Sequence, residues 1–287
     1  MMTLKQFAKN IGKINNPLGK GIKESNRDSF IIISGHTGEG KSTLAIRLAY
    51  HYSAIKKVPF SLDNNITYDI KEFLNWIGGG ENIKDKKPRM SSIIGDEIIS
   101  FFYKRDWYAE SLKGAFELLN KGRTNNYLIL GCVPIFWHID RDVRSLVRYN
   151  IYCYRGHNIA HVFEATDNPG DDDPWNRKLI SKAYNKKRLQ NCPNYVTTLI
   201  CEDLNQEQKI KYKLIRETKR KNTELQHRKQ KIISGKKWLY QRNKLVQFIL
   251  NNYKDISHRQ IAKTMDIDNK NISDILKWNG EYSDLRR

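Results

Sequence analysis

Short continuous apolar runs recur along the first part of the chain, and each has the length of a β-strand. Such runs are typical of strands buried on both faces of a sheet. Strands that alternate with helical segments predict a parallel sheet with helices on both faces, a three-layer α/β fold. The expected strands are residues 30–33, one within 58–68, 91–95, 127–133, 150–154 and 161–165.

Helical spacing of apolar residues fills the intervals between these runs and continues to the C-terminus. The expected helices begin near residue 41 and cover 70–77, 101–123, 244–253, 257–265 and 269–278. A short helical patch also lies within residues 4–11, in a basic N-terminal segment that is either an arm or a lead-in to the first strand.

The first apolar run is followed by Gly-His-Thr-Gly-Glu-Gly-Lys-Ser, residues 35–42. This matches the phosphate-loop pattern of Gly, four residues, Gly-Lys and Ser or Thr, with a helix starting at its end. Glycines let backbone N–H groups point inward, and the helix dipole adds positive charge at the same place. The sequence therefore predicts an ATP site, with a glycine-rich strand-to-helix turn as the alternative. The expected ATP-binding residues are Gly35, His36, Thr37, Gly38, Glu39, Gly40, Lys41, Ser42 and Thr43.

An acidic pair, Asp96 and Glu97, ends the apolar run at 91–95. Downstream of a phosphate loop, such a pair indicates the second part of a nucleotide site, although two solvated acids at a strand end are the alternative. Asp96 and Ser42 are expected to hold Mg²⁺, and Lys41 to neutralise phosphate charge. Glu97 is placed to polarise the attacking water as a general base.

Charge indicates the kind of partner. The 287 residues include 51 Lys and Arg against 31 Asp and Glu, a formal net charge of +20. Such an excess favours a polyanion, either nucleic acid or an acidic membrane surface. No apolar run reaches the roughly 20 residues of a spanning helix, and the N-terminus lacks a secretory apolar region. DNA is therefore the expected partner, without membrane insertion.

Four cysteines, at positions 132, 153, 192 and 201, show neither CxxC spacing nor clustered histidines. Zinc and disulfide sites are not expected, and a reducing cytoplasmic location fits. An acidic turn at 167–175 is interpreted as a solvated loop, with a metal-dependent nuclease centre as a remote alternative.

The basic excess is concentrated late in the chain. Residues 205–245 hold 14 Lys and Arg against three Asp and Glu, a surplus of 11, with no proline and one glycine. An exposed charged helix is the ordinary interpretation, but so one-sided a surplus favours contact with phosphates.

The last 50 residues resemble a DNA-binding helix-turn-helix, with a capping serine at Ser257, small Ala262 at the helix contact and a short turn. Asp266 stands where a turn glycine is usual, and a small helical module that docks on protein is the alternative. The resemblance implies that the groove-facing residues are Asn269, Lys270, Asn271, Ser273 and Lys277.

The expected organisation has four parts: an N-terminal arm (1–28), a P-loop ATPase domain (29–200), a basic helical linker (201–237) and a helix-turn-helix domain (238–287).

Three segments together, GHTGEGKST, SSIIGDE and NKGRTNNYLILGCVPIFWHIDRDVRSLVRY, resemble the P-loop ATPases that have an additional strand and a catalytic glutamate. Within that division the chain is most similar to the FtsK/HerA-like motors and the zonular-occludens-toxin-like ATPases of plasmids and viruses. The similarity covers residues 30 to about 165.

This resemblance implies a RecA-like sheet, rings that are usually hexamers, and ATP hydrolysis that drives DNA translocation or packaging. It also implies an arginine that completes the neighbouring subunit's site by stabilising transition-state charge. Arg144 is the first choice, with Arg141 and Arg148 behind it, and a solvated basic helix is the alternative. The sequence departs from the pattern at Cys132 and Val133, which stand where a polar sensor residue is usual.

The leading hypothesis is thus a ring-forming, DNA-translocating ATPase of a mobile element, working with a capsid, replication or conjugation component. A second hypothesis is an ATP-switched loader, replication or partition protein that does not translocate. A third is a DNA-binding regulator whose nucleotide site only gates assembly.

Overall fold

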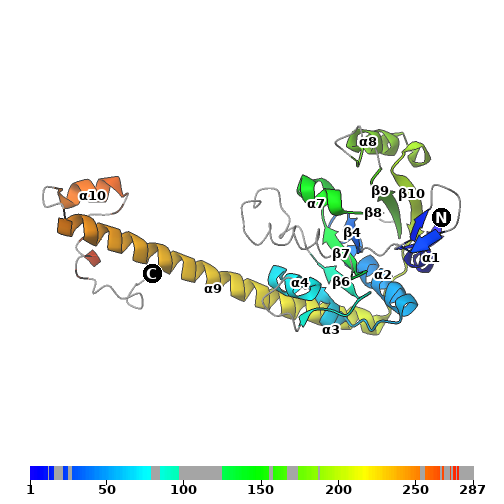
Figure 1. The fold of residues 1–287 in the computed structure, drawn as a ribbon, viewed down its shortest axis with the longest axis horizontal. Helices are drawn as coiled ribbons and strands as arrows, with labels where there is room; N and C mark the ends of the chain where they lie inside the picture. Colours follow the sequence, from blue (N-terminus) through cyan, green and yellow to red (C-terminus); the bar gives the residue numbers. More distant parts are fainter. Residues whose placement is uncertain are drawn as a thin grey trace. The chain divides into compact units, whose positions relative to one another are not determined.

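The computed structural model contains an eight-stranded sheet covered by helices (Figure 1). It describes residues 1–11, 13–15, 22–24, 28–78, 85–96, 125–154, 158–166, 174–186, 188–252, 256–265, 267, 272, 274–275 and 277. By compactness the chain divides into two units, Met1–Lys219 and Arg220–Arg287. The eight-stranded sheet belongs to the first unit.

Strands and helices alternate through most of the first unit. The strands are β1 (Met2–Thr3), β2 (Lys13–Asn15), β3 (Ile22–Glu24), β4 (Ser29–Ser34), β5 (Ile66–Thr67), β6 (Ser92–Gly95), β7 (Leu128–Val133), β8 (Tyr149–Tyr154), β9 (Ile159–Glu164) and β10 (Tyr195–Ile200). The helices are α1 (Leu4–Asn10), α2 (Lys41–Lys56), α3 (Leu62–Asn65), α4 (Ile70–Ile77), α7 (Arg141–Leu146) and α8 (Arg177–Asn185), with short 3₁₀ turns η3 (Phe136–His138) and η4 (Leu189–Asn191).

The strand before the phosphate loop, β4, lies inside the sheet, whose order is β1-β10-β9-β8-β4-β7-β6-β5. β4 pairs in parallel with β7 and β8, and β6 pairs in parallel with β5 and β7. One strand, β7, therefore separates the loop strand from the acidic strand β6. This is the additional strand that the sequence resemblance implied.

The sheet is not parallel throughout, so the expectation of a parallel sheet is wrong at one edge. β9 runs antiparallel to both β8 and β10. β8 ends at Tyr154 and β9 begins at Ile159, which leaves too few residues for a parallel crossover of about a dozen residues. A short connection of this kind closes a hairpin instead.

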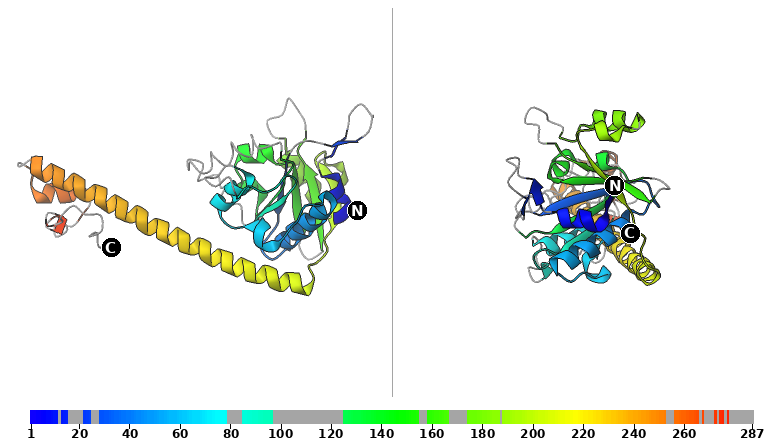
Figure 2. Two further views of the ribbon diagram at one scale, coloured as in Figure 1. Left: turned by 60° about the horizontal axis from the view of Figure 1, so that its bottom comes forward. Right: turned by 90° about the vertical axis from the view of Figure 1, so that its right-hand side faces the viewer.

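Apolar side chains fill both faces of the sheet and form two cores. Along β4, Ile31 and Ile33 face one core, while Phe30 and Ile32 face the other. Helices α1 and α2 cover the first face, and α4 and α7 cover the second. The expected three-layer arrangement is thus present, and Figure 2 gives two further views of it.

The first eleven residues belong to this structure. β1 pairs in parallel with β10, and Thr3 caps α1 through a capping box with Gln6. Leu4 and Phe7 are buried in the first core, where the Phe7 ring meets Tyr149 edge-on at 5.4 Å. This segment is therefore an integral layer of the core.

The second unit contains the end of one long helix and a small helical core. Helix α9 (Gln206–Asn252) begins in the first unit and continues into the second, where α10 (His258–Thr264) follows with the expected cap at Ser257. Its buried core consists of Val246, Ile261, Ala262, Ile272 and Ile275. Among the described residues, no helix has the length and apolar character that crossing a bilayer requires.

Several expectations fall on segments outside the described residues. These segments include the expected helix at 101–123, most of the acidic turn at 167–175, and most of the expected last helix at 269–278.

Candidate nucleotide-binding site

The phosphate loop connects the end of β4 to the start of α2, where the sequence predicted it. Gly35, Gly38 and Gly40 all have positive φ angles, of 147°, 88° and 78°. A side chain is strained in that region of backbone space, which explains why glycine occupies these positions. At Gly38 and Gly40 an added Cβ would meet no atom within 4 Å, so there is open space beside these two residues.

Lys41, the first residue of α2, folds its ammonium group back over the loop. Its Nζ donates hydrogen bonds to the backbone carbonyls of Gly35 and His36, at 2.8 and 2.7 Å. The backbone N–H of His36 in turn donates to Glu39 Oε2 at 2.7 Å. The loop is therefore held by hydrogen bonds that involve two of its own charged side chains, Lys41 and Glu39.

The two expected metal ligands, Ser42 and Asp96, come from different elements of the fold and contact each other. Ser42 Oγ, at the start of α2, donates to Asp96 Oδ1 at 2.9 Å. Asp96 directly follows β6 and is only 4% exposed. Hydroxyl and carboxylate oxygens are the hard ligands that Mg²⁺ takes in proteins, so this pair fits a magnesium site. Thr43 follows as the third residue of α2.

Two tyrosines that the sequence did not predict for this site also contact Asp96. Tyr68 OH and Tyr212 OH both donate to Asp96 Oδ2, at 2.8 and 2.7 Å. Burial, followed by the negative charge of Asp96, raises the pKa of both hydroxyls well above the usual range. Both groups therefore stay protonated and act as donors to the carboxylate at neutral pH.

Tyr68 comes directly after β5, at the carboxyl ends of the strands, where the glycine-rich loop and Asp96 also lie. Because ligands bind at this end of a parallel sheet, the sequence position of Tyr68 could have indicated a place in the site. Tyr212 lies on α9, 116 residues after Asp96, and no local pattern marks it.

At the end of β7, Cys132 and Val133 offer no polar sensor, as the sequence indicated. Val133 belongs to the second core, and Cys132 is buried, with its thiol pKa raised well above normal by burial and then by Asp96. A polar pair lies instead on the adjacent strands β4 and β8, where Ser34 Oγ donates a hydrogen bond to Asn150 Oδ1 at 2.8 Å.

A cavity of about 290 Å³ adjoins the phosphate loop on the side of the second core. It is lined by Ser34, His36, Pro134, Ile135, Phe136, Trp137, Asn150, Tyr152, Phe163, Ile180, Ser181 and Tyr184.

The three candidate arginines lie around α7. Arg144 donates to the carbonyls of Trp137 and Ile139 at 3.1 and 2.9 Å, and its guanidinium lies over the Trp137 ring. Arg148 pairs with Glu164 at 3.6 Å, while Arg141 is exposed. In this arrangement the guanidinium of Arg144 contacts its own chain.

The part of the chain that the structure describes does not place the remaining predicted catalytic and DNA-binding residues at this site. Glu97 lies outside them, as do Asn269, Lys270, Asn271 and Ser273. Lys277 is described and exposed in the second unit. Among described residues, no group of three or more His, Cys, Asp or Glu side chains could hold a metal ion.

No model of a protein family matches this sequence, and no curated protein sequence matches it. Solved structures with a similar fold include the N-terminal domain of zonular occludens toxin from Neisseria meningitidis, at 19% identity over 54% of this chain and 91% of that one, with a TM-score of 0.37. The genome packaging NTPase B204 from Sulfolobus turreted icosahedral virus 2, solved with sulfate, is 14% identical over 48% of this chain and 91% of that one, with a TM-score of 0.35. The FIGL-1 AAA domain is 18% identical over 44% and 43%, with a TM-score of 0.31. At these identities and TM-scores, the similarity does not identify a function for this chain.

Proposed function

We propose that this chain is an ATP-hydrolysing motor that binds DNA and translocates or packages it for a virus or plasmid. The observation that carries the proposal is the contact of Ser42 with Asp96 at the end of a glycine-rich loop whose carbonyls hold the ammonium group of Lys41. Lysine, hydroxyl and carboxylate at the carboxyl edge of parallel strands are the groups that bind and hydrolyse a magnesium nucleotide. ATP and Mg²⁺ are the proposed cofactors.

In this mechanism each residue performs one task. Lys41 exchanges the carbonyls of Gly35 and His36 for phosphate oxygens and neutralises their charge. Ser42 and Asp96 would hold Mg²⁺, which would neutralise phosphate charge. Glu97 accepts a proton from the attacking water.

The proposed DNA partner rests on charge. Helix α8 carries Arg177, Lys178 and Lys182 among the residues that line a shallow hollow, together with Ser181, Asn185 and Lys186. The helix has no acidic residue, and Lys178 and Lys182 are exposed. With the surplus in α9, this basic surface supports binding to a phosphate backbone. The helix-turn-helix with Asn269, Lys270, Asn271, Ser273 and Lys277 stays part of the proposal.

Assembly into a ring is proposed from the sequence resemblance. An arginine of α7 would then reach the neighbouring subunit's nucleotide, with Arg144 first and Arg141 and Arg148 behind it. Because Arg144 contacts the carbonyls of Trp137 and Ile139, its use in trans requires that these hydrogen bonds open.

One observation favours a second candidate, an ATP-switched DNA-binding protein without translocation. Tyr212 lies on the helix that continues into the second unit, and it contacts the carboxylate of the proposed metal site. Such a contact suits a protein in which the nucleotide resets binding elsewhere in the chain.

ATP turnover with and without duplex DNA tests the proposal. The wild-type chain should hydrolyse ATP faster when DNA is present. Glu97→Gln should keep nucleotide binding and lose turnover by about 10²-fold or more, because the amide cannot accept the proton. Glu217→Gln, which changes an exposed acid on α9, is the matched control and should behave as wild type.

Displacement of a protein roadblock from duplex DNA then separates the two candidates. A motor removes the roadblock in an ATP-dependent manner. Slow turnover that ignores DNA, with no displacement, would contradict the motor and favour the switch.

A further inference from the structure

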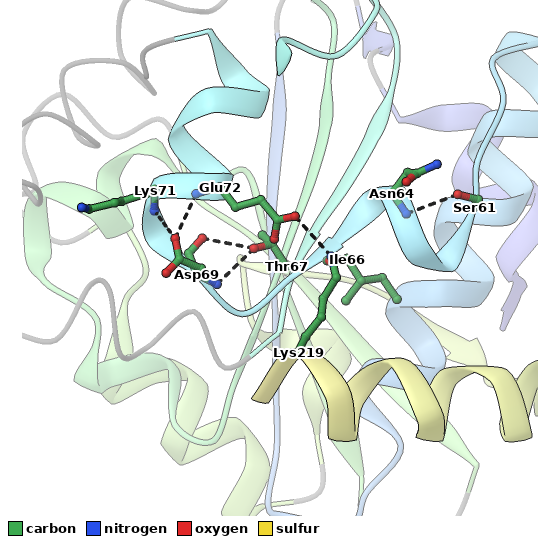
Figure 3. A network of polar contacts seen from close by, with 8 residues as sticks. All are labelled: Ser61, Asn64, Ile66, Thr67, Asp69, Lys71, Glu72 and Lys219. Carbon is green, nitrogen blue, oxygen red and sulfur yellow. Dashed lines mark hydrogen bonds and ion pairs between the residues drawn. The ribbon is translucent and has the colours of Figure 1, made fainter. Parts of the chain in front are cut away.

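The first turns of α9 are fastened to the core of the first unit by a row of contacts. Lys211 Nζ pairs with Asp63 Oδ2 of α3 at 2.7 Å, and Ile215 packs against the first hydrophobic core. Lys219 Nζ donates to the Ile66 carbonyl of β5 at 2.6 Å and lies 3.3 Å from Glu72 Oε1 (Figure 3). Residues 206–219 therefore lie along the α3–β5–α4 side of the core.

Tyr212 is the member of this row that enters the nucleotide site. A carboxylate offers about four lone-pair positions to donors. Three hydroxyls already donate to Asp96, from Ser42, Tyr68 and Tyr212. Mg²⁺ binds with several of its waters retained, and each such water is a further donor to a nearby carboxylate.

We propose that Tyr212 is a positioning residue through which the magnesium–nucleotide site and the attachment of α9 influence each other. Occupation of the site by Mg²⁺ and nucleotide competes with the Tyr212 hydroxyl for Asp96 and loosens residues 206–219. The inference rests on the nucleotide site proposed above, and it names a regulatory contact of that site.

Tyr68 cannot serve the same role, although it donates to the same oxygen. Tyr68 follows β5 in the sheet layer, so its own position does not depend on the attachment of α9, although its hydroxyl also hydrogen-bonds to that of Tyr212. Among the described residues, Tyr212 is the one that connects Asp96 by a hydrogen bond to the helix that continues to Asn252 in the second unit. By linkage, if the binding of Mg²⁺ loosens the attachment of α9, then the release of α9 must increase the affinity for Mg²⁺.

Hydrogen–deuterium exchange of the full-length chain tests the contact directly. In the wild type, Mg²⁺ with ATPγS should make the backbone amides of residues 206–219 exchange roughly fivefold faster, which is the loss expected for one hydrogen bond. ATPγS with EDTA should leave this exchange unchanged. Tyr212→Phe should exchange at the faster rate without ligand and should not respond further.

Tyr68→Phe is the matched comparison, because it removes a hydroxyl from the same carboxylate and a hydrogen bond to Tyr212 but keeps the contact of Tyr212 with Asp96. It should keep the response of residues 206–219 to Mg²⁺ and ATPγS. A fluorescent ATP analogue gives a second readout: Tyr212→Phe should need roughly fivefold less Mg²⁺ for half-maximal binding than wild type.

The outcomes separate this inference from the function on which it rests. If the wild type binds the analogue but residues 206–219 exchange equally with and without Mg²⁺–ATPγS, the coupling is overturned and the nucleotide site stands. The same holds if Tyr212→Phe responds as wild type does. If the wild type binds no nucleotide, both are overturned.

Discussion

At the scale of single residues, Asp28 shows how burial changes the charge state of an acid at a strand start. Its Oδ1 accepts a hydrogen bond from the Tyr127 backbone N–H at 2.9 Å, which joins the segments that lead into β4 and β7. Burial raises the pKa of Asp28 from 3.8 to about 6, against the opposing effect of backbone donors at residues 125–127. The folded chain therefore binds this proton more tightly than the unfolded chain does.

A raised pKa makes the free energy of unfolding fall as the pH rises from about 4 to about 6. For a fully buried group the fall would be about 3 kcal/mol, and the partial exposure of Asp28 reduces it to roughly 1–2 kcal/mol. Asp28→Asn keeps the acceptor oxygen and removes the titration. The stability of the variant relative to wild type should therefore increase between pH 4 and pH 6 and stay constant above.

Urea denaturation of both proteins from pH 4 to pH 7.5 measures this difference, because the other titrating groups are common to both. A difference that does not change with pH would show that Asp28 titrates alike in the folded and unfolded chains.

The glycine-rich loop between a strand and a helix could be predicted, because eight consecutive positions match the phosphate-loop pattern and the flanking strand and helix agree with it. The position of Asp96 at the end of a strand could be predicted because it directly follows an apolar run. Tyr212 could not, because its position depends on the course of α9, which is set by packing and ion pairs far from Asp96 in sequence.

At the scale of secondary-structure elements, α1 is the clearest case of a segment whose role depends on packing. Its apolar residues Leu4, Phe7, Ala8 and Ile11 have helical spacing, so the helix itself was predictable. Its attachment was not, because β1 pairs with β10, almost 200 residues later. The hairpin of β8 and β9 is a different case: the alternation of strands and helices along the chain predicts a parallel sheet, but the short interval between these two strands excludes a parallel crossover.

Phe7→Ala tests whether α1 is part of the folded core. Phe7 is 4% exposed and packs on Tyr149, so its truncation should lower the free energy of unfolding by about 3–5 kcal/mol. Lys5→Ala, on the exposed side of the same helix, is the control and should change stability by less than about 0.5 kcal/mol. Urea denaturation gives both values. A Phe7→Ala variant as stable as the control would mean that α1 is a detachable arm.

At the scale of the whole molecule, the chain combines a proposed nucleotide site and a basic excess in two compact units. The units divide between Lys219 and Arg220, inside α9, where neither glycine nor proline marks a boundary in the sequence. A continuous helix conceals such a boundary, because helical spacing runs through it. The predicted boundaries at 200 and 237 stay predictions. The described nucleotide-site residues, Tyr212 included, belong to the first unit.

A chain truncated after Lys219 tests how the two functions divide. Residues 220–287 hold 16 Lys and Arg against seven Asp and Glu, so nine of the net 20 positive charges are removed. Nucleotide binding should persist, because Lys41, Ser42 and Asp96 keep their described contacts. DNA affinity should fall by about tenfold or more, and the slope of log Kobs against log[salt] should become less steep as phosphate contacts are lost.

Fluorescence anisotropy with labelled duplex DNA at several salt concentrations measures both quantities. The residual binding of the truncated chain should depend on α8, so Lys178→Ala with Lys182→Ala should reduce it further. Full-length affinity and salt slope in the truncated chain would place the DNA contacts in the first unit alone and remove the basis for a DNA-binding role of the second.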